Sequence, residues 1–412
     1  QGIIEEDQNY GKNEKNDTPV LSLTTKGIKV KTNLNYGKSA ESYIGHQLVE
    51  KGDVVFTPRD FDQTPILSDV SKYNGCISNL YIVDKVKKEV LNYFINYYWH
   101  GLKYSVDYFK NFSHGIRYSF NRFQFDEIPL LIPPISEQKI IVRYLDNKNE
   151  QIDKLIYNIK KKIELLKQKR TSLINHYVTK GLDPKVDMKE TAVKWIGKIP
   201  KHWKLQKLKH IVNKRGLIRG PFGGSLKIDT FVPKGYKVYE QKNAIYDNFS
   251  LGSAYINDKK YTELKRFSIQ QNDILMSCSG TIGKTSLVRG EFEKGIINQA
   301  LLIIRLEFPE KTLPKYIQTI FSSSFFQEQI IDNSQGGAMK NLVGIDIFKN
   351  VKIPLPNSME QLEILSYIDN KCLILDELIT KEKLKVEKLK EYLRTLTSSV
   401  VTGKVRIIES MV

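Results

Sequence analysis

Two stretches of the chain carry apolar residues at every seventh position, which is the pattern of a coiled-coil seam. In the first stretch the seam residues are Leu145, Ile152, Ile159, Leu166 and Leu173, flanked by Ile156, Ile163 and Tyr177. In the second stretch they are Cys372, Ile379, Val386, Leu393 and Val400, flanked by Leu375, Leu389 and Leu396. The pattern predicts two long helices that each present one apolar stripe.

Residues typical of helix boundaries stand at both ends of these two stretches: prolines and an acid at the start, and a glycine after the end. The markers are Pro133-Pro134, Glu137 and Gly181 for the first, and Pro356, Glu360 and Gly403 for the second. A helix from Glu137 to Lys180 rises on the order of 60 Å at about 1.5 Å per residue, which is more than one domain needs. Two helices of matching phase most simply pack antiparallel and relate two domains by a pseudo-twofold axis. The alternative is two unrelated amphipathic helices buried in separate cores.

The chain also repeats itself. Residues Pro133–Gln138 match Pro356–Gln361 at an offset of 223, counted from Glu137 to Glu360. The same offset pairs Tyr144 with Tyr367, Asp146-Asn147-Lys148 with Asp369-Asn370-Lys371, and Val178-Thr179 with Val401-Thr402. A weaker match at an offset of 220 pairs Gly52–Phe56 with Asn272–Met276 and Gly75–Ile77 with Gly295–Ile297. Each half therefore holds a variable domain followed by a similar helical segment, which indicates one task performed on two targets.

Short β-rich runs and helical stretches alternate in each variable domain, so we expect an α+β fold. The strands are expected at Asp53–Phe56, Leu80–Val83, Asp273–Met276 and Ala300–Ile304, and the helices at Lys87–Tyr98 and Pro314–Ile331. The expected order is a first domain at 1–135, a first spacer helix at 136–182, a second domain at 183–358 and a second spacer helix with its tail at 359–412. The chain begins with Gln1, not Met, and Gln1 aligns with Pro221 at the 220 offset. We therefore expect the start of the first domain to be incomplete; the alternative is that this domain starts differently from the second.

Composition favours a polyanionic partner. The 412 residues contain 64 Lys and Arg against 46 Asp and Glu, a formal net charge of +18. Such an excess attracts nucleic acid, because each neutralised phosphate releases a condensed counterion, although extra lysines can also serve solubility alone. The three cysteines have neither metal-ligand nor disulfide spacing, which fits a reducing cytoplasm. No apolar run is long enough for a membrane helix.

Motifs for catalysis are weak. The run Gly280–Thr285 comes close to a phosphate-binding loop, but Cys278 stands where that loop requires glycine, and the residues after it do not form a helical pattern. It is either a DNA-contacting turn or a plain hairpin. The six histidines show no metal spacing, and His202 beside Trp203 resembles a packing motif. No methyltransferase motif or glycine-rich cofactor loop follows a strand. We therefore assign no catalytic and no metal-binding residue.

The order of several short segments resembles the specificity subunits of type I restriction–modification systems. These segments are Val178–Pro184 with Trp195–Trp203, Gly220–Leu226, Ile353–Pro356 with Glu360-Gln361, and Val401–Val405. The resemblance covers nearly the whole chain. It implies two target-recognition domains alternating with two spacer helices, each domain reading one half of a split DNA target. It further implies that the helices dock two methyltransferase subunits, which use S-adenosylmethionine to methylate adenine, and that motor-nuclease subunits join them. This chain itself would be non-catalytic and hold no cofactor.

Polar loop residues are the candidates for contacting DNA. Gly-bearing loops at Ser113–Arg117 and Ser334–Asn341 can approach a phosphate backbone closely, although ordinary turns have the same composition. The candidate DNA-binding residues are Arg59, Arg117, Arg219, Gln241, Lys242, Ser279, Lys284, Gln335 and Lys340. Two other classes of function stay open: a nuclease or methyltransferase acting alone, and a coiled-coil scaffold that does not read DNA.

Overall fold

The computed structural model describes residues 4–6, 18–31, 46–61, 64–104, 108–112, 118–332 and 341–412. The chain divides into two compact units. The first comprises Gln1–Lys161 with Lys381–Val412, and the second comprises Lys162–Thr380. Among the described residues, no helix combines the length and the apolar character needed to cross a bilayer.

The first unit is built on small antiparallel sheets covered by one helix. Its strands are β1 (Ile4–Glu6), β2 (Leu21–Thr24), β3 (Gly27–Val30), β4 (Gln47–Val49), β5 (Val54–Phe56), β6 (Ser68–Val70), β7 (Gly75–Ile77) and β8 (Ile82–Val86). Its short helices are α1 (Asn92–Tyr104), the 3-10 helix η1 (Tyr108–Phe112), α2 (Arg122–Asp126) and η6 (Glu409–Met411). The main sheet has the order β1-β8-β5-β6. Aromatic side chains fill the core between this sheet and α1, with Phe56 and Trp99 edge to face.

The second unit has two four-stranded sheets, β12-β19-β16-β17 and β13-β15-β14-β18. Its strands are β9 (Met188–Glu190), β10 (Lys198–Pro200), β11 (Lys204–Lys207), β12 (Val212–Arg219), β13 (Phe231–Val232), β14 (Tyr236–Tyr239), β15 (Tyr255–Ile256), β16 (Ile274–Ser277), β17 (Thr285–Leu287), β18 (Gly295–Ile297), β19 (Leu301–Leu306), β20 (Ile331–Asp332), β21 (Asn341–Leu342) and β22 (Lys352–Leu355). Its short helices are η2 (Leu208–His210), η3 (Gly223–Ser225), η4 (Ile228–Thr230), α4 (Gln241–Ile245), α5 (Asp258–Glu263), η5 (Lys265–Phe267), α6 (Pro314–Phe321), α7 (Ser324–Ile330) and α8 (Ile345–Phe348). The α+β class is confirmed in both units.

Two long helices, α3 (Ile135–Lys180) and α9 (Ser358–Val401), confirm the heptad prediction. Every seam and flanking residue named from the heptad pattern is buried or half-buried, while Leu155 and Leu384, outside the pattern, are exposed. Both helices end one or two residues before a glycine in the left-handed region, Gly181 and Gly403, each with φ of 74°. That conformation suits glycine and allows the chain to leave the helix sharply.

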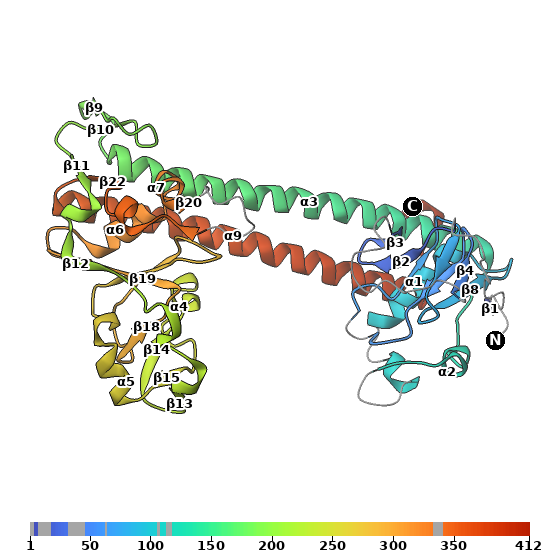
Figure 1. Ribbon diagram of the computed structural model, residues 1–412. Coiled ribbons are helices and arrows are strands. Elements are labelled where there is room, and N and C mark those ends of the chain that lie inside the picture. The colour runs from blue at the N-terminus through green and yellow to red at the C-terminus, as the bar shows by residue number, and fades with distance from the viewer. Residues whose placement is uncertain are drawn as a thin grey trace. The chain divides into compact units, whose positions relative to one another are not determined.

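Within each unit, the segments of α3 and α9 lie side by side and antiparallel (Figure 1). In the second unit, the Arg170 guanidinium lies 3.2 Å from the Asp376 carboxylate and the Tyr177 hydroxyl lies 3.2 Å from that of Tyr367. In the first unit, Leu145 of α3 shares one apolar cluster with Val400 of α9. The two stripes therefore share a core in each unit, and the alternative of separate cores is wrong.

A buried glutamine performs the same task in both units. Gln138 accepts a hydrogen bond from the backbone N–H of Leu91 (2.8 Å) and donates to the carbonyls of Glu89 and Pro133. Gln361 accepts from Leu313 N–H (2.9 Å) and donates to the carbonyls of Lys311 and Pro356. Both side chains are fully buried. The repeat in the sequence is thus a repeat in three dimensions, in which the start of α3 holds the residues just before α1 and the start of α9 holds those just before α6.

Several expected boundaries in the first unit are wrong by a few residues. Helix α1 begins at Asn92, not Lys87, and continues to Tyr104. Strand β8 begins at Ile82, because Leu80 and Tyr81 lie in a turn, and it extends to Val86. The amide of Gln138 holds residues 89–91 in a non-helical turn, a long-range constraint that local patterns do not reveal.

The helix expected at Pro314–Ile331 is in fact two helices. Helix α6 ends at Phe321 and α7 begins at Ser324. Between them, the Ser323 hydroxyl donates to the carbonyl of Ile320 (2.5 Å), and Asn175 of α3 accepts from the N–H of Ser324 (2.9 Å). Serine side chains that bond to nearby backbone compete with a continuous helix. The tandem serines 322–324 therefore account for the break.

Candidate nucleic-acid interface

Three of the candidate residues lie at one end of the β12-β19-β16-β17 sheet. Arg219 ends β12 and pairs with Leu302 of β19, which pairs with Met276 of β16. Met276 in turn pairs with Thr285 of β17. The turn that holds Ser279 and Lys284 therefore begins at the same end of the sheet as Arg219. The sheet collects these polar residues from segments about 60 residues apart in the sequence.

The turn from Cys278 to Lys284 is a hairpin loop held by one buried serine. The Ser277 hydroxyl donates to the carbonyl of Thr281 (2.6 Å) and accepts from the N–H of Lys284 (3.0 Å), while Gly283 N–H donates to the Ser277 carbonyl (2.9 Å). Strand β17 follows directly and runs antiparallel to β16, so no helix begins here. The departure from a phosphate-binding loop is confirmed. Ser279 is half-buried and Lys284 is exposed, so the loop presents a cation on a fixed backbone.

Arg219 lies in a partly enclosed position. Its Nε atom is buried without a hydrogen-bond partner, and its guanidinium lies 5.4 Å from the ring centre of Phe222, which is itself exposed. Burial raises the pKa of the neighbouring Cys278 thiol to about 12, and the positive charge of Arg219 acts in the opposite direction. The thiol is therefore neutral. An unsatisfied guanidinium donor beside an exposed aromatic ring suits a ligand that brings acceptor atoms.

The described segments on either side of Gln335 and Lys340 are strands β20 and β21, which pair with each other. The N–H of Leu342, in β21, donates to the carbonyl of Cys278 in the hairpin (3.3 Å). Gln335 and Lys340 themselves lie outside the described residues. The pairing of β20 with β21 holds the chain before and after them, and β21 is hydrogen-bonded to the hairpin.

Gln241 and Lys242 lie on α4, which packs against β16 and β17. Gln241 is half-buried at the first position of the helix. The Lys242 ammonium lies 2.6 Å from the carboxylate of Glu240, so its charge is already partnered. Because its charge is already partnered, Lys242 is the weakest of the candidates as a phosphate ligand.

Two of the candidate residues, Arg59 and Arg117, belong to the first unit. Arg59 is exposed and forms an isolated antiparallel bridge with Ser119. Arg117, with the rest of the Ser113–Arg117 loop, lies outside the described residues. The bridge joins the backbone at Arg59 to the described segment that begins at residue 118.

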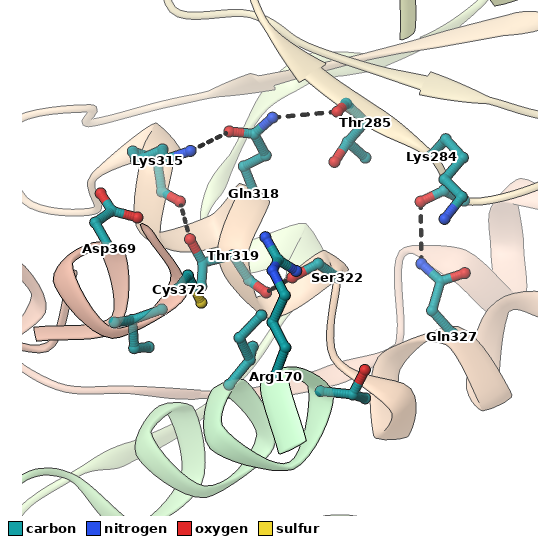
Figure 2. Close-up of a pocket in the computed structure, with 14 residues that line it drawn as sticks. Arg170, Lys284, Thr285, Lys315, Gln318, Thr319, Ser322, Gln327, Asp369 and Cys372 are labelled. Carbon is teal, nitrogen blue, oxygen red and sulfur yellow. Dashed lines mark hydrogen bonds between the residues drawn. The ribbon is translucent and has the colours of Figure 1, made fainter. Parts of the chain in front are cut away.

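Sequence reasoning missed two cations that share a cavity with Lys284. Arg170 of α3 and Lys315 of α6 line this cavity of about 390 Å³ in the second unit (Figure 2). Neither residue stood in a suggestive motif, and Arg170 was hidden among the many charged residues of a spacer helix. Only the packing of α3 and α6 against the hairpin brings the three cations together.

Sequence reasoning interpreted His202 and Trp203 as a packing pair, and the structure adds their partner. Trp203 is buried and its Nε1–H donates to Glu360 Oε1 (2.8 Å), while His202 Nε2 lies 3.0 Å from Glu360 Oε2. The acid at the start of α9 thus ties the start of the second unit's domain to the helix. The three cysteines are free and buried.

Comparison with known proteins places the chain in a family. The model of the type I restriction modification DNA specificity domain matches residues 5–165 and 200–388. The chain belongs to this family. The two matched ranges correspond to the two halves of the internal repeat.

Among its relatives is the specificity subunit of the type I restriction enzyme MjaVIII from Methanocaldococcus jannaschii, 28% identical over 307 residues, which covers 69% of this chain and 63% of the relative. Another is the specificity subunit of the type I restriction enzyme EcoBI from Escherichia coli, 26% identical over 259 residues, covering 58% of this chain and 50% of the relative. The chain thus spans about half to three fifths of the length of these curated relatives.

The fold also has a known counterpart. A chain from a solved structure on the assembly and conformational transition of the type I R-M system has a TM-score of 0.64 and 13% identity, covering 87% of this chain and 84% of that chain. At that identity the likeness concerns the fold alone. It agrees with two specificity domains combined with the long helices α3 and α9.

Proposed function

We propose that this chain is the DNA-specificity subunit of a type I restriction–modification enzyme and that each of its two domains reads one half of a split DNA target. The family match over both halves carries the proposal. The internal repeat supports it, because two domains with the same frame and different loops suit two different sequences. The net charge of +18 supports a polyanionic partner.

The proposal assigns recognition to this chain and chemistry to its partners. Methyltransferase subunits would dock on α3 and α9 and methylate adenine with S-adenosylmethionine, and motor-nuclease subunits would join to cut unmodified DNA. The exposed leucines Leu362, Leu373 and Leu384 lie 11 residues apart on α9, about three helical turns, and so share one face that a partner helix could cover. The chain itself would hold no cofactor and would act in the cytoplasm.

Expression of the chain with its methyltransferase partner tests the proposal directly. We expect adenine methylation at a two-part sequence with an unread gap, mapped by single-molecule sequencing of genomic DNA. Exchange of residues 212–343 for the corresponding part of another family member should change one half of the methylated sequence and leave the other half intact. Methylation that ignores sequence, or that changes in both halves, would contradict the proposal.

The salt dependence of DNA binding separates this function from that of a coiled-coil scaffold. A DNA reader should lose affinity steeply as salt rises, with a log–log slope of about −0.9 for each phosphate neutralised. Fluorescence anisotropy with the assembled complex measures this slope. A slope near zero would favour the scaffold, and turnover of DNA by the isolated chain would favour an enzyme.

A further inference from the structure

The cavity beside the hairpin is lined by residues of α3, α6, α7 and α9, of the hairpin itself and of strand β17, all in the second unit. Arg170 and Ile174 come from α3, Lys284 from the hairpin, Lys315 and Thr319 from α6, and Asp369 and Cys372 from α9. Figure 2 shows Arg170 rising from its helix into the space below Gln318 and Thr285. The volume of about 390 Å³ holds a phosphate group with several further atoms. The buried side chains of Ile174 and Cys372 supply the apolar part of the lining. Burial raises the pKa of the Cys372 thiol, so this group adds no negative charge to the cavity.

Cations outnumber acids among the charged residues that line this cavity, which are Arg170, Lys284, Lys315 and Asp369. The neutral groups are already bonded within the protein: Gln318 donates to the carbonyl of Thr285, Gln327 to that of Gly283 and Thr319 to that of Lys315. Lys315 bonds to the amide oxygen of Gln318 (3.2 Å), and Lys284 has no carboxylate partner among the described residues.

Two carboxylates lie near these cations. Asp376 pairs with Arg170, and Asp369 stands exposed at the rim. The three cations thus retain an excess of positive charge after both acids are counted. This lining selects an anion over a neutral ligand.

The corresponding place in the first unit is filled. The two buried glutamines bind Leu91 in the first unit and Leu313 in the second, so these two leucines are equivalent. Counting six residues on from each makes Tyr97 of α1 equivalent to Thr319 of α6. The Tyr97 hydroxyl donates to Asp146 (2.6 Å) and accepts from Asn149 (2.9 Å). At the 223 offset, Asp146 corresponds to Asp369 and Asn149 to Cys372.

The fold itself therefore does not require an open cavity at this position. The first unit closes it with one large side chain and two hydrogen bonds. At two of the three corresponding positions the second unit has smaller residues, Thr319 and Cys372, while the aspartate is the same in both copies, and cations line the space. Such a difference between two copies of one frame indicates a role specific to the second unit.

We propose that the cavity lined by Arg170, Lys284 and Lys315 is a phosphate-binding site specific to the second unit. A planar guanidinium and two ammonium groups suit the oxygens of a phosphate mono- or diester. The phosphate belongs either to a free phosphorylated molecule or to the DNA backbone. A bound phosphate would join α3 and α6 to the hairpin that carries Ser279. The site stands independently of the proposed half-site reading.

Titration of the full chain with inorganic phosphate and pyrophosphate tests the site, with sodium chloride at matched ionic strength as the reference. We expect both anions to raise the melting temperature and to give a saturable calorimetric signal. The double variant Lys284→Gln/Lys315→Gln should bind at least tenfold more weakly. Thr319→Tyr, which copies Tyr97 of the first unit, should abolish binding. The matched control Lys209→Gln/Lys259→Gln removes two exposed lysines elsewhere in the unit and should bind as the parent does.

A second measurement distinguishes the two sources of phosphate. If free phosphate binds as described and the cavity variants leave the salt slope of DNA binding unchanged, the ligand is a free phosphorylated molecule. If free phosphate does not bind, but Lys284→Gln/Lys315→Gln lowers the log–log salt slope of DNA binding by about 0.9 or more relative to the control, the ligand is the DNA backbone. If neither the titration nor the slope responds to the cavity variants, the proposal is overturned. The titration needs no DNA, so its outcome is separate from that of the proposed function.

Discussion

Replacement of Gln361 by leucine is expected to lower the free energy of unfolding of the second unit by about 3 to 5 kcal/mol. Leucine fills a similar volume but can make none of the three hydrogen bonds of Gln361. The N–H of Leu313 and the carbonyls of Lys311 and Pro356 would then lose the partner that Gln361 supplies, and each such group costs about 1 to 3 kcal/mol where it is shielded from water. A shift of that size is a large part of the stability of one unit.

Hydrogen-exchange mass spectrometry in increasing urea measures this loss unit by unit. Gln168→Leu is the matched control, because Gln168 is exposed on α3 and its replacement should change stability by less than about 0.5 kcal/mol. Gln138→Leu should reproduce the loss in the first unit. A Gln361→Leu protein that exchanges like the parent would show that this hydrogen-bond cluster contributes little.

Replacement of Arg219 by methionine is expected to weaken binding to the target sequence by about ten- to 100-fold, which corresponds to about 1 to 3 kcal/mol. The reason is the position of its guanidinium, which ends a strand at the hairpin end of the sheet with one donor unsatisfied. Methionine keeps an apolar stem against Phe222 while removing the charge and the donors. Specificity should relax at one position of one half of the target.

Arg215→Met is the matched control for this variant. Arg215 is exposed on the same strand, four residues before Arg219, and forms no ion pair among the described residues. Competition anisotropy with the methyltransferase complex, using the target and duplexes altered at single positions, gives both affinity and specificity. Equal affinities of the Arg219→Met and Arg215→Met proteins for the target would remove Arg219 from the reading surface.

The long helices could be predicted closely because their signal is local and repeated. An apolar residue at every seventh position over four heptads, about eight helical turns, is compatible with little other than a helix. Helix α3 accordingly begins two residues from the expected Glu137 and ends at the expected Lys180. The offset of 223 residues also predicted which side chains would be equivalent, as Gln138 and Gln361 demonstrate. The identical tasks of these two glutamines were not visible in the sequence.

The errors and omissions have a common physical origin in contacts between distant segments. The start of α1 depends on an amide that is 47 residues further along the chain, and the break after α6 involves Asn175 of α3. The cations Arg170 and Lys315 join Lys284 only after three elements have packed together. No local pattern contains such information. The roles of the candidate DNA-binding residues stay predictions, since base recognition depends on geometry with a bound duplex.

Because the first unit is assembled from both ends of the chain, it cannot be completed until the last residues have been synthesised. Residues 381–412 complete this unit, whereas the second unit consists of one continuous segment, residues 162–380. A ribosome therefore releases everything needed for the second unit before the first unit can close. Domains usually fold in the order in which they emerge, but here the later one should mature earlier. Until residues 381–412 are synthesised, the apolar cluster around Leu145 lacks Val400, Val401 and Ile407.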